Sequence, residues 1–223
     1  MSLSNRKVVI TGGPTREWLD PVRYISNPSS GKMGISLADE SFNRGYSTVF
    51  IHGTVDSSLL KDKGYRMVSV ETTDDLLTAV LNEINRDVIL IMAAAPVDYS
   101  PIKKSETKIK KEEGELLLRL KKNPDILKSV AIKKEKDISL VNLFVVGFAA
   151  ETDNVEEYAL KKLRDKKLDM ICLNDVSRKD AGFGTETNVV TIFTKNGEKI
   201  EFPLLSKKEL SSRILNCIEA NLV

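Results

Sequence analysis

Short apolar runs alternate with amphipathic stretches along the first half of the chain. Continuous apolar runs at 7–11, 46–51 and 88–95 predict strands that are buried on both faces, as in a parallel sheet. Between these runs, residues 30–44 and 72–84 carry apolar side chains at helical spacing and predict amphipathic helices. Strand and helix therefore alternate, which predicts an α/β protein with a doubly wound, mostly parallel sheet.

The second half of the chain continues this pattern and then departs from it. Apolar runs at 144–148 and 168–173 predict two further strands of the same sheet, joined by a helix that begins at Asp153 and Asn154. Asn196-Gly197 lies between two strand patterns, which is a strong hairpin signal. An amphipathic helix is predicted over 206–221. We therefore expect a Rossmann-like fold with a C-terminal β-hairpin.

Residues 100–122 interrupt the alternation of strand and helix. The segments 108–111 and 116–120 are predicted to be two strand-like arms around a turn at Gly114. Such an excursion is either a surface hairpin or a mobile flap over a site. After it, Asn123, Pro124 and Asp125 predict a helix start with Asn as the N-cap and Pro at the first helical position.

The composition fits one domain. The chain has 223 residues, of which 41% are hydrophobic and 30% charged, so it can bury a sizeable core without disulfides. We expect a single domain over residues 1–223. Cys172 and Cys217 lie in apolar patterns and predict buried thiols. The one histidine, His52, and the lack of a Cys-x-x-Cys motif argue against a zinc site or a Ser-His triad.

Charge and hydropathy exclude other classes of partner. The net charge is +2, and no aromatic residues interleave with the lysine clusters, so a nucleic-acid groove is not favoured. The longest apolar run, 88–97, is too short to span a bilayer, and the N-terminus has no signal-peptide core. We expect a cytoplasmic protein with neither a nucleic-acid nor a membrane partner.

Candidate chemistry gathers where predicted strands end. Ser29, Ser30 and Gly31 place hydroxyls and bare backbone N–H groups at the predicted start of a helix, which suits an anion. The alternative is that Ser30 simply caps the helix. Gly12 follows the first strand, and Asp98 follows the third, where ligands of such sheets bind.

Taken in chain order, these segments resemble the phosphopantothenoylcysteine synthetase family, the phosphopantothenate–cysteine ligases of coenzyme A synthesis. Each segment alone is a weak signal, but their order is highly specific. The segments are 12–15, 23–34, 93–99, 108–111, 123–126 and 147–152, with Lys162, Lys166 and Asn174-Asp175. In bacteria this enzyme usually follows a flavin-dependent decarboxylase on the same polypeptide. The resemblance therefore implies a stand-alone bacterial-type ligase, with a separate decarboxylase as a possible partner.

The resemblance implies a two-step reaction. CTP activates 4'-phosphopantothenate as an acyl-cytidylate with release of pyrophosphate, and L-cysteine then displaces CMP. Mg²⁺ is expected to accompany the nucleotide, although its ligands cannot be assigned from the sequence because Mg²⁺ binds largely through phosphates and water. Some relatives use ATP, so the choice of nucleotide stays open, with the motif set favouring CTP.

The resemblance also implies roles for individual residues. Asn27, Lys108 and Arg23 are expected to be catalytic, with Lys108 stabilising the departing pyrophosphate and Asn27 holding the acyl intermediate. Substrate binding is assigned to Arg23, Asn27, Ser29, Ser30, Gly31 and Lys32. Nucleotide binding is assigned to Gly12, Ala93, Ala94, Ala95, Asp98, Lys108, Asn123, Pro124, Asp125, Ile126, Phe148, Lys162 and Lys166.

The family is dimeric, so we expect a homodimer that shares part of its site between subunits. The contact is expected from the flap at 100–122 or from a hairpin and dimerisation region at about 176–203; the sequence does not choose between them. Lys162 and Lys166 are four residues apart and share a helix face, which can clamp a triphosphate or can simply be solvated.

Two other functions compete with the ligase. A short-chain dehydrogenase using NAD(P) is suggested by Thr11-Gly12-Gly13 and by the spacing of Tyr158 and Lys162. Against it, the first loop lacks the later glycines of a dinucleotide fingerprint, and Tyr158 is expected on the apolar side of its helix. A non-enzymatic nucleotide-binding module is the third option.

Overall fold

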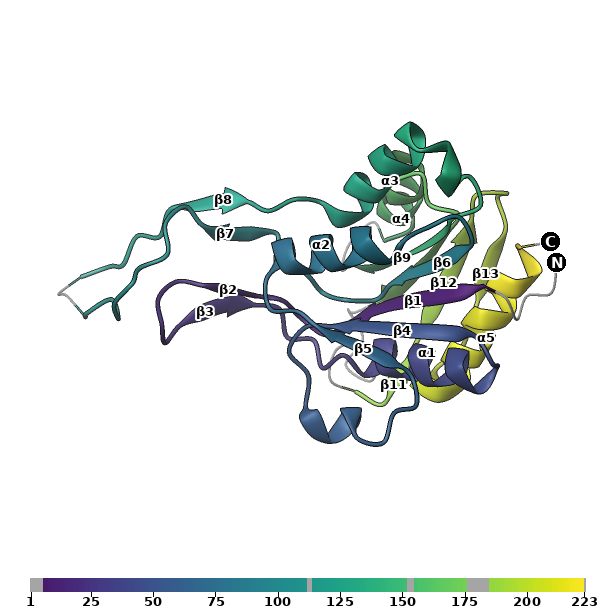
Figure 1. Ribbon diagram of the computed structural model, residues 1–223, viewed down its shortest axis with the longest axis horizontal. Coiled ribbons are helices and arrows are strands. Elements are labelled where there is room, and N and C mark those ends of the chain that lie inside the picture. The colour runs from purple at the N-terminus through teal and green to yellow at the C-terminus, as the bar shows by residue number, and fades with distance from the viewer. Residues whose placement is uncertain (1–5, 112–113, 152–154, 176–184, 223) are drawn as a thin grey trace.

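The apolar runs form one eight-stranded sheet at the centre of the molecule (Figure 1). The computed structural model describes residues 6–111, 114–151, 155–175 and 185–222. Six strands are parallel, in the order β10-β9-β6-β1-β4-β5, and β12 and β13 extend this sheet antiparallel beyond β10. The strands are β1 (Lys7–Gly12), β4 (Ser47–His52), β5 (Arg66–Ser69), β6 (Val88–Met92), β9 (Phe144–Glu151), β10 (Met170–Asp175), β12 (Val190–Thr194) and β13 (Lys199–Glu201).

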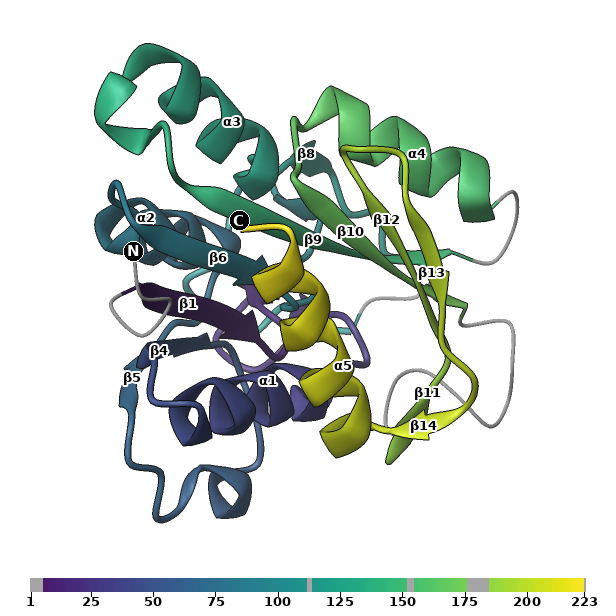
Figure 2. The same cartoon turned by 90° about the vertical axis from the view of Figure 1, so that its right-hand side faces the viewer.

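Helices cover both faces of the sheet, as the doubly wound pattern predicts (Figure 2). One apolar cluster joins α1 and α5 to the face that carries Ile10 and Ile91. The other joins α2, α3 and α4 to the face that carries Val9 and Leu90. Both faces of the central strands are therefore buried, which explains their unbroken apolar sequence. The helices are α1 (Lys32–Asn43), α2 (Thr73–Glu83), α3 (Ile126–Lys136), α4 (Val155–Asp165) and α5 (Lys207–Ala220).

Local signals explain most helix ends. Thr72 caps α2 in a capping box with Asp75, and Ser206 caps α5 in the same way with Glu209. The helix predicted over 30–44 begins later than expected, at Lys32, because Gly31 adopts a left-handed conformation with φ 76° and interrupts helical geometry. Ser30 is therefore not the N-cap.

Several sequence expectations are corrected by the structure. The N-cap of α3 is Asp125, whose side chain accepts a hydrogen bond from Lys128 N, and not Asn123. Strand β5 was not anticipated, because as an edge strand it exposes three of its four residues. Tyr158 is 47% exposed and does not lie on the apolar side of α4. The predicted start of that helix at Asp153 and Asn154 lies outside the described residues.

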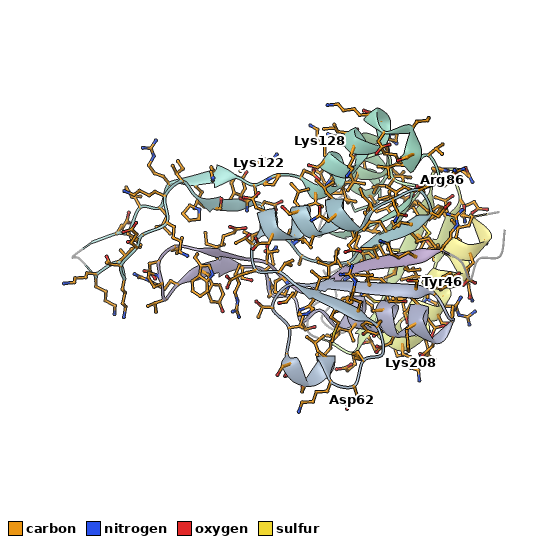
Figure 3. All side chains as sticks on the ribbon, in the orientation of Figure 1. Tyr46, Asp62, Arg86, Lys122, Lys128 and Lys208 are labelled. Atoms are coloured by element: carbon orange, nitrogen blue, oxygen red, sulfur yellow. The ribbon has the colours of Figure 1, made fainter. Side chains whose placement is uncertain are left out.

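Two β-ribbons project from the carboxyl end of the sheet (Figure 1). One is formed by β2 (Arg16–Trp18) and β3 (Tyr24–Ser26), and the other by β7 (Tyr99–Pro101) and β8 (Leu120–Lys122). The flap at 100–122 is therefore confirmed as an excursion, but its strands lie at its base and not at 108–111 and 116–120. Figure 3 shows Lys122 on this projection, while Tyr46 and Arg86 mark the opposite end of the molecule.

A buried carboxylate ties the two ribbons together. Asp20 accepts hydrogen bonds from Arg23 Nη2 at 2.6 Å and from Ile109 N at 3.1 Å. Burial alone would raise the pKa of Asp20, but the Arg23 and backbone hydrogen bonds outweigh it and hold that pKa well below its usual range. Arg23 also donates to Ile109 O at 2.5 Å, so the flap has a fixed anchor on the first ribbon.

The hairpin at the C-terminal end of the sheet is confirmed, with β12 and β13 paired around Asn196-Gly197. The short strands β11 (Thr187–Asn188) and β14 (Leu205–Ser206) lead into and out of it. Residues 176–184 of the region proposed for dimerisation lie outside the described part of the chain. In the part that is described, no helix is long and apolar enough to cross a membrane.

Candidate active site

A cavity of about 380 Å³ opens at the carboxyl end of the parallel strands. Its walls come from segments that are far apart in the sequence: the loop before α1, the loop after β6, the ends of β9 and β10, and the start of α5. Parallel strands leave their loops at one edge of a sheet, which is why these segments meet there. The cavity holds the residues expected for substrate binding at 27–32 and Ala93, Ala94, Ala95 and Asp98 of the nucleotide set.

The floor of the cavity depends on close approach between β1 and α1. A Cβ built on Gly34 would lie 2.8 Å from Gly12 Cα and 2.9 Å from Thr11 O, both backbone atoms. Side chains are excluded at this crossing, so α1 can approach the strand end directly. Gly12 is buried below the cavity and does not line it, so its expected role in nucleotide binding is indirect here.

Asn27 connects two walls of the cavity. Its Nδ2 donates to Pro96 O at 3.0 Å and to Ala95 O at 3.3 Å, across from the loop that follows β6. That loop is itself tied to β1, because Ala94 N donates to the Thr11 hydroxyl at 3.1 Å. The Asn27 amide is thus held at the cavity by donating, which leaves its oxygen to accept from a ligand.

A buried polar network fixes the far end of the same loop. Val97 N donates to Thr15 Oγ1 at 2.9 Å, and Thr15 Oγ1 lies 3.0 Å from Thr73 Oγ1 at the start of α2. Asn123 Nδ2 donates to Val97 O at 2.8 Å and to Glu17 Oε1 at 3.2 Å. Thr15 and Thr73 are almost fully buried, so each hydroxyl needs these partners. Asn123 therefore positions the loop and the start of α3.

A second pocket of about 200 Å³ adjoins the first and shares four of its lining residues. The shared residues are Ala94, Pro96, Asp98 and Phe148. The second pocket is completed by all of the expected 123–126 segment and by Lys166. The two pockets thus adjoin, and the aromatic Phe148 lies beside polar groups in the wall that they share.

The two lysines of α4 face this pair of pockets, as their spacing predicts. Lys162 lines the first pocket and Lys166 lines the second. Lys166 Nζ lies 3.0 Å from Asp125 Oδ2. Burial alone would raise the pKa of Asp125, but the Lys166 hydrogen bond and the Lys128 N–H bond lower it. The interpretation of Lys162 and Lys166 as a purely solvated face is therefore not favoured.

Two expected catalytic residues lie away from the cavity of this chain. Arg23 is engaged by Asp20 on the first ribbon, and Lys108 lies in the flap; neither lines either pocket. The structure thus brings Asn27, Lys162 and Lys166 together but leaves Arg23 and Lys108 on the projecting ribbons.

Sequence reasoning missed polar residues of the C-terminal wall. Asn188 and Lys207 line the first pocket, and so does Asn174, which was recognised in a motif but given no role. Lys207 is 5% exposed, and its Nζ donates to Thr185 O. Burial lowers the pKa of Lys207. No spacing signal identifies Asn188 or Lys207, because each lies among other polar residues at the end of its element.

Among the described residues, no three His, Cys, Asp or Glu side chains form a cluster that could hold a metal ion. Asp98 is the carboxylate that lines both pockets.

The fold and the paired pockets define an α/β protein with a ligand site at the carboxyl edge of a parallel sheet. A more specific assignment comes from similarity to known proteins. The chain belongs to the family described as DNA/pantothenate metabolism flavoprotein C-terminal domain, whose model matches residues 3–222. The resemblance found in the sequence is thereby confirmed.

Curated relatives include coenzyme A biosynthesis bifunctional proteins CoaBC. The protein of Bacillus subtilis is 44% identical over 219 residues, covering 98% of this chain and 52% of its own length. That of Escherichia coli K12 is 42% identical over 216 residues, covering 96% of this chain and 51% of its own. The chain thus spans about half the length of the curated relatives it matches.

Solved structures agree with this assignment. The C-terminal domain of a CoaBC protein is 36% identical, with a TM-score of 0.75 and coverage of 99% of this chain and 98% of the other. A Cab2 mutant in complex with phosphopantothenate-cysteine has a TM-score of 0.74 at 17% identity, covering 98% and 88%, and supports the fold. The relatives with a printed role are coenzyme A biosynthesis proteins, which does not support the dehydrogenase alternative.

Proposed function

We propose that this chain is a phosphopantothenate–cysteine ligase of coenzyme A biosynthesis. The supporting observation is that segments scattered from Asn27 to Lys166 border two adjoining pockets, which suit different parts of a nucleotide-activated acid. The second pocket has the ring of Phe148 and a backbone-rich wall at 123–126, which suit a nucleobase. The first pocket has lysines and backbone N–H groups near Gly31, which suit phosphates.

In the proposed first step, a carboxylate oxygen of 4'-phosphopantothenate attacks the α-phosphorus of CTP. A phosphorus–oxygen bond forms, and the bond to pyrophosphate breaks. Catalysis of this kind depends on positioning and on charge stabilisation more than on covalent chemistry from side chains. Lys162 and Lys166 supply positive charge beside the two pockets, and the Asn27 amide oxygen is placed to accept a hydrogen bond from an N–H or O–H group of the acyl intermediate.

In the second step, the amine of L-cysteine attacks the acyl carbon and CMP leaves. When bound, Mg²⁺ would neutralise charge on the triphosphate that is consumed in the first step. Asp98 is the side chain of the described cavity wall that fits a cation or its water ligands. The loop that carries Asp98 is fixed by Asn27 and by the Thr15 network, so its position does not depend on the ligand.

The proposed active unit is a homodimer in which the ribbons reach the neighbouring subunit. Arg23 and Lys108 lie on the ribbons, outside the pockets of their own chain. The ribbons expose many large apolar side chains, which favours them over the C-terminal hairpin as the contact. These residues are Val22, Tyr24, Tyr99, Ile102, Leu116, Leu117, Leu118 and Leu120. Replacing Leu117 with Glu should convert dimer to monomer in sedimentation velocity.

The test of the function is pyrophosphate release from each nucleoside triphosphate, with and without phosphopantothenate and cysteine. Release that requires phosphopantothenate and is greatest with CTP supports the proposal. Saturable NADH binding without pyrophosphate release would revive the dehydrogenase alternative. Release without phosphopantothenate would contradict ligase chemistry. Size-exclusion chromatography tests whether the chain binds a flavin-dependent decarboxylase, and cell fractionation tests the expected cytoplasmic location.

Lys108 provides a specific check of the flap. The Lys108→Gln variant should lose pyrophosphate release while folding normally, because Lys108 lies in an exposed segment and contributes charge to the departing group. Mixing it with the Asn27→Asp variant should restore amide formation at up to about a quarter of the sites if the flap acts across subunits, because amide product requires both residues. Near-normal turnover of Lys108→Gln alone would contradict the assignment.

A further inference from the structure

The C-terminal wall of the cavity contains two buried oxygens that have no partner. Asn174 Oδ1 and Asn188 Oδ1 make no hydrogen bond, and their residues are only 7% and 3% exposed. In the described part of the chain one other buried side-chain atom is in this state, Ser41 Oγ, which does not line the cavity. Buried polar atoms are nearly always paired, so two unpaired acceptors in one cavity call for a ligand.

The sheet brings both amides to the same wall of the cavity. Asn174 is opposite Val190 in the antiparallel pairing of β10 and β12. Asn188 is the last residue of β11 and lies two residues before Val190, the first residue of β12. Both residues line the first pocket. The two oxygens therefore belong to one subsite.

The chemistry of these oxygens restricts the occupant. An amide oxygen is an uncharged acceptor, so it binds an N–H or O–H group without favouring the protonated, charged form of that group. Two such acceptors match the two N–H groups of a primary amine. A carboxylate pair would instead hold the protonated ammonium, whose lone pair is unavailable for attack.

The charges around the subsite favour the same ligand. Of the described residues that line the cavity, Lys32, Lys162 and Lys207 are cationic and Asp98 is anionic, and Lys32 is paired with Glu186. Lysine side chains in the same cavity disfavour a bound ammonium and so favour the neutral amine. The same cations attract a carboxylate. An α-amino acid carries both groups.

We propose that Asn174 and Asn188 form the subsite that accepts the amine of L-cysteine and directs its lone pair at the activated acyl carbon. This inference rests on the proposed ligase function. In the step, a nitrogen–carbon bond forms as the bond from acyl carbon to the cytidylate oxygen breaks. CMP leaves with that electron pair, and the surplus amine proton passes to solvent. Asn174 and Asn188 are positioning residues for the nucleophile.

The test separates the two half-reactions with the Asn188→Ala variant. Hydroxylamine, a small nucleophile, consumes the acyl-cytidylate without needing the subsite, so pyrophosphate release in its presence reports the first step. We expect the KM for cysteine to rise about fivefold, the usual cost of one lost hydrogen bond, with hydroxylamine-dependent release within about twofold of wild type. The matched control is Asn85→Ala, which changes an exposed amide just before β6, at the end of the sheet away from the cavity. It should change neither the KM for cysteine nor the hydroxylamine-dependent release.

Thermal unfolding adds a readout that a structural role would not reproduce. Asn188→Ala removes a buried atom that has no partner, so the melting temperature of the ligand-free protein should stay equal or rise. The Asn188→Asp variant adds negative charge, which favours the ammonium form of the bound amine. The rise of kcat/KM for cysteine with pH should therefore occur at higher pH than in wild type. Asn174→Ala should repeat the cysteine effect of Asn188→Ala.

Three results would overturn the inference while leaving the ligase function intact. An unchanged KM for cysteine in both alanine variants would show that the amides do not contact the amine. A raised KM for CTP with an unchanged one for cysteine would assign them to the nucleotide. A lower melting temperature with unaltered kinetics would make them structural. Failure of wild type to release pyrophosphate with any nucleotide would instead refute the proposed function itself.

Discussion

The Thr15→Val variant tests whether the cavity loop is positioned by buried hydrogen bonds. Valine has nearly the same shape as threonine but lacks the hydroxyl. Thr15 Oγ1 accepts from Val97 N at 2.9 Å and lies 3.0 Å from Thr73 Oγ1, and all three residues are buried. The substitution therefore removes two hydrogen bonds and leaves the Val97 N–H unpaired.

The magnitude follows from these contacts. A buried N–H group left without a partner costs about 1–3 kcal/mol, and the lost bond between hydroxyls adds about 1 kcal/mol. The free energy of unfolding should thus fall by about 3 kcal/mol. For a chain of this length, such a loss lowers the melting temperature by roughly 6–12 °C. Val97 comes directly before Asp98, and Asp98 lines both pockets. The KM for the nucleotide should therefore also rise.

Urea unfolding, monitored by circular dichroism, measures the free energy of unfolding. Pyrophosphate release at varied nucleotide concentration measures the KM for the nucleotide. The matched control is Thr78→Val, an exposed position on the same α2 helix as Thr73, which should change the free energy of unfolding by less than about 0.5 kcal/mol. A Thr15→Val loss as small as that of the control would refute the reasoning, since it would mean that Val97 N finds another partner.

Three other variants test separate features of the site. Gly34→Ala should lose about 1–3 kcal/mol of stability in urea unfolding, because its Cβ meets the backbone of Gly12 and α1 must move away; wild-type stability would contradict this close approach. Asn27→Asp should form the acyl-cytidylate but stall amide formation, measured as pyrophosphate release against product, whereas equal loss of both steps would argue against its role in holding the intermediate. Asp125 has a lowered pKa in the folded protein, so its contribution to stability is present above the unfolded pKa of about 4 and is lost as pH falls through the folded value. Lys166→Met should therefore lose less stability than wild type as the pH falls below about 4, and identical acid unfolding curves would show that the Lys166 contact does not cause the shift.

Periodic apolar patterns predicted the body of the fold well because burial on both faces leaves a continuous signal. The strands β1, β6 and β9 and the helices α2 and α5 lie close to where the sequence placed them. Strand β5 escaped notice because an edge strand with mostly exposed residues has no such signal. The late start of α1 depends on the φ value of Gly31, which no spacing rule specifies.

The sequence likewise predicted only part of the candidate site. The ordered family segments identified most residues that line the two pockets, from Asn27 to Lys166. They did not indicate that Arg23 and Lys108 lie on ribbons outside those pockets, because this depends on tertiary geometry. Asn188 went unrecognised, since a buried polar side chain is visible only when its unpaired atom is located in three dimensions.

The order in which the walls of the cavity appear along the polypeptide has a consequence for biosynthesis. The earliest wall contains Asn27, and the last contains Lys207 at the first turn of the terminal helix. A ribosome-bound chain can pair β1 with β4 and β6 well before it has synthesised α5. Such a nascent chain has most of its sheet but an open, incomplete pocket, so affinity for substrate should emerge only after α5 has been synthesised.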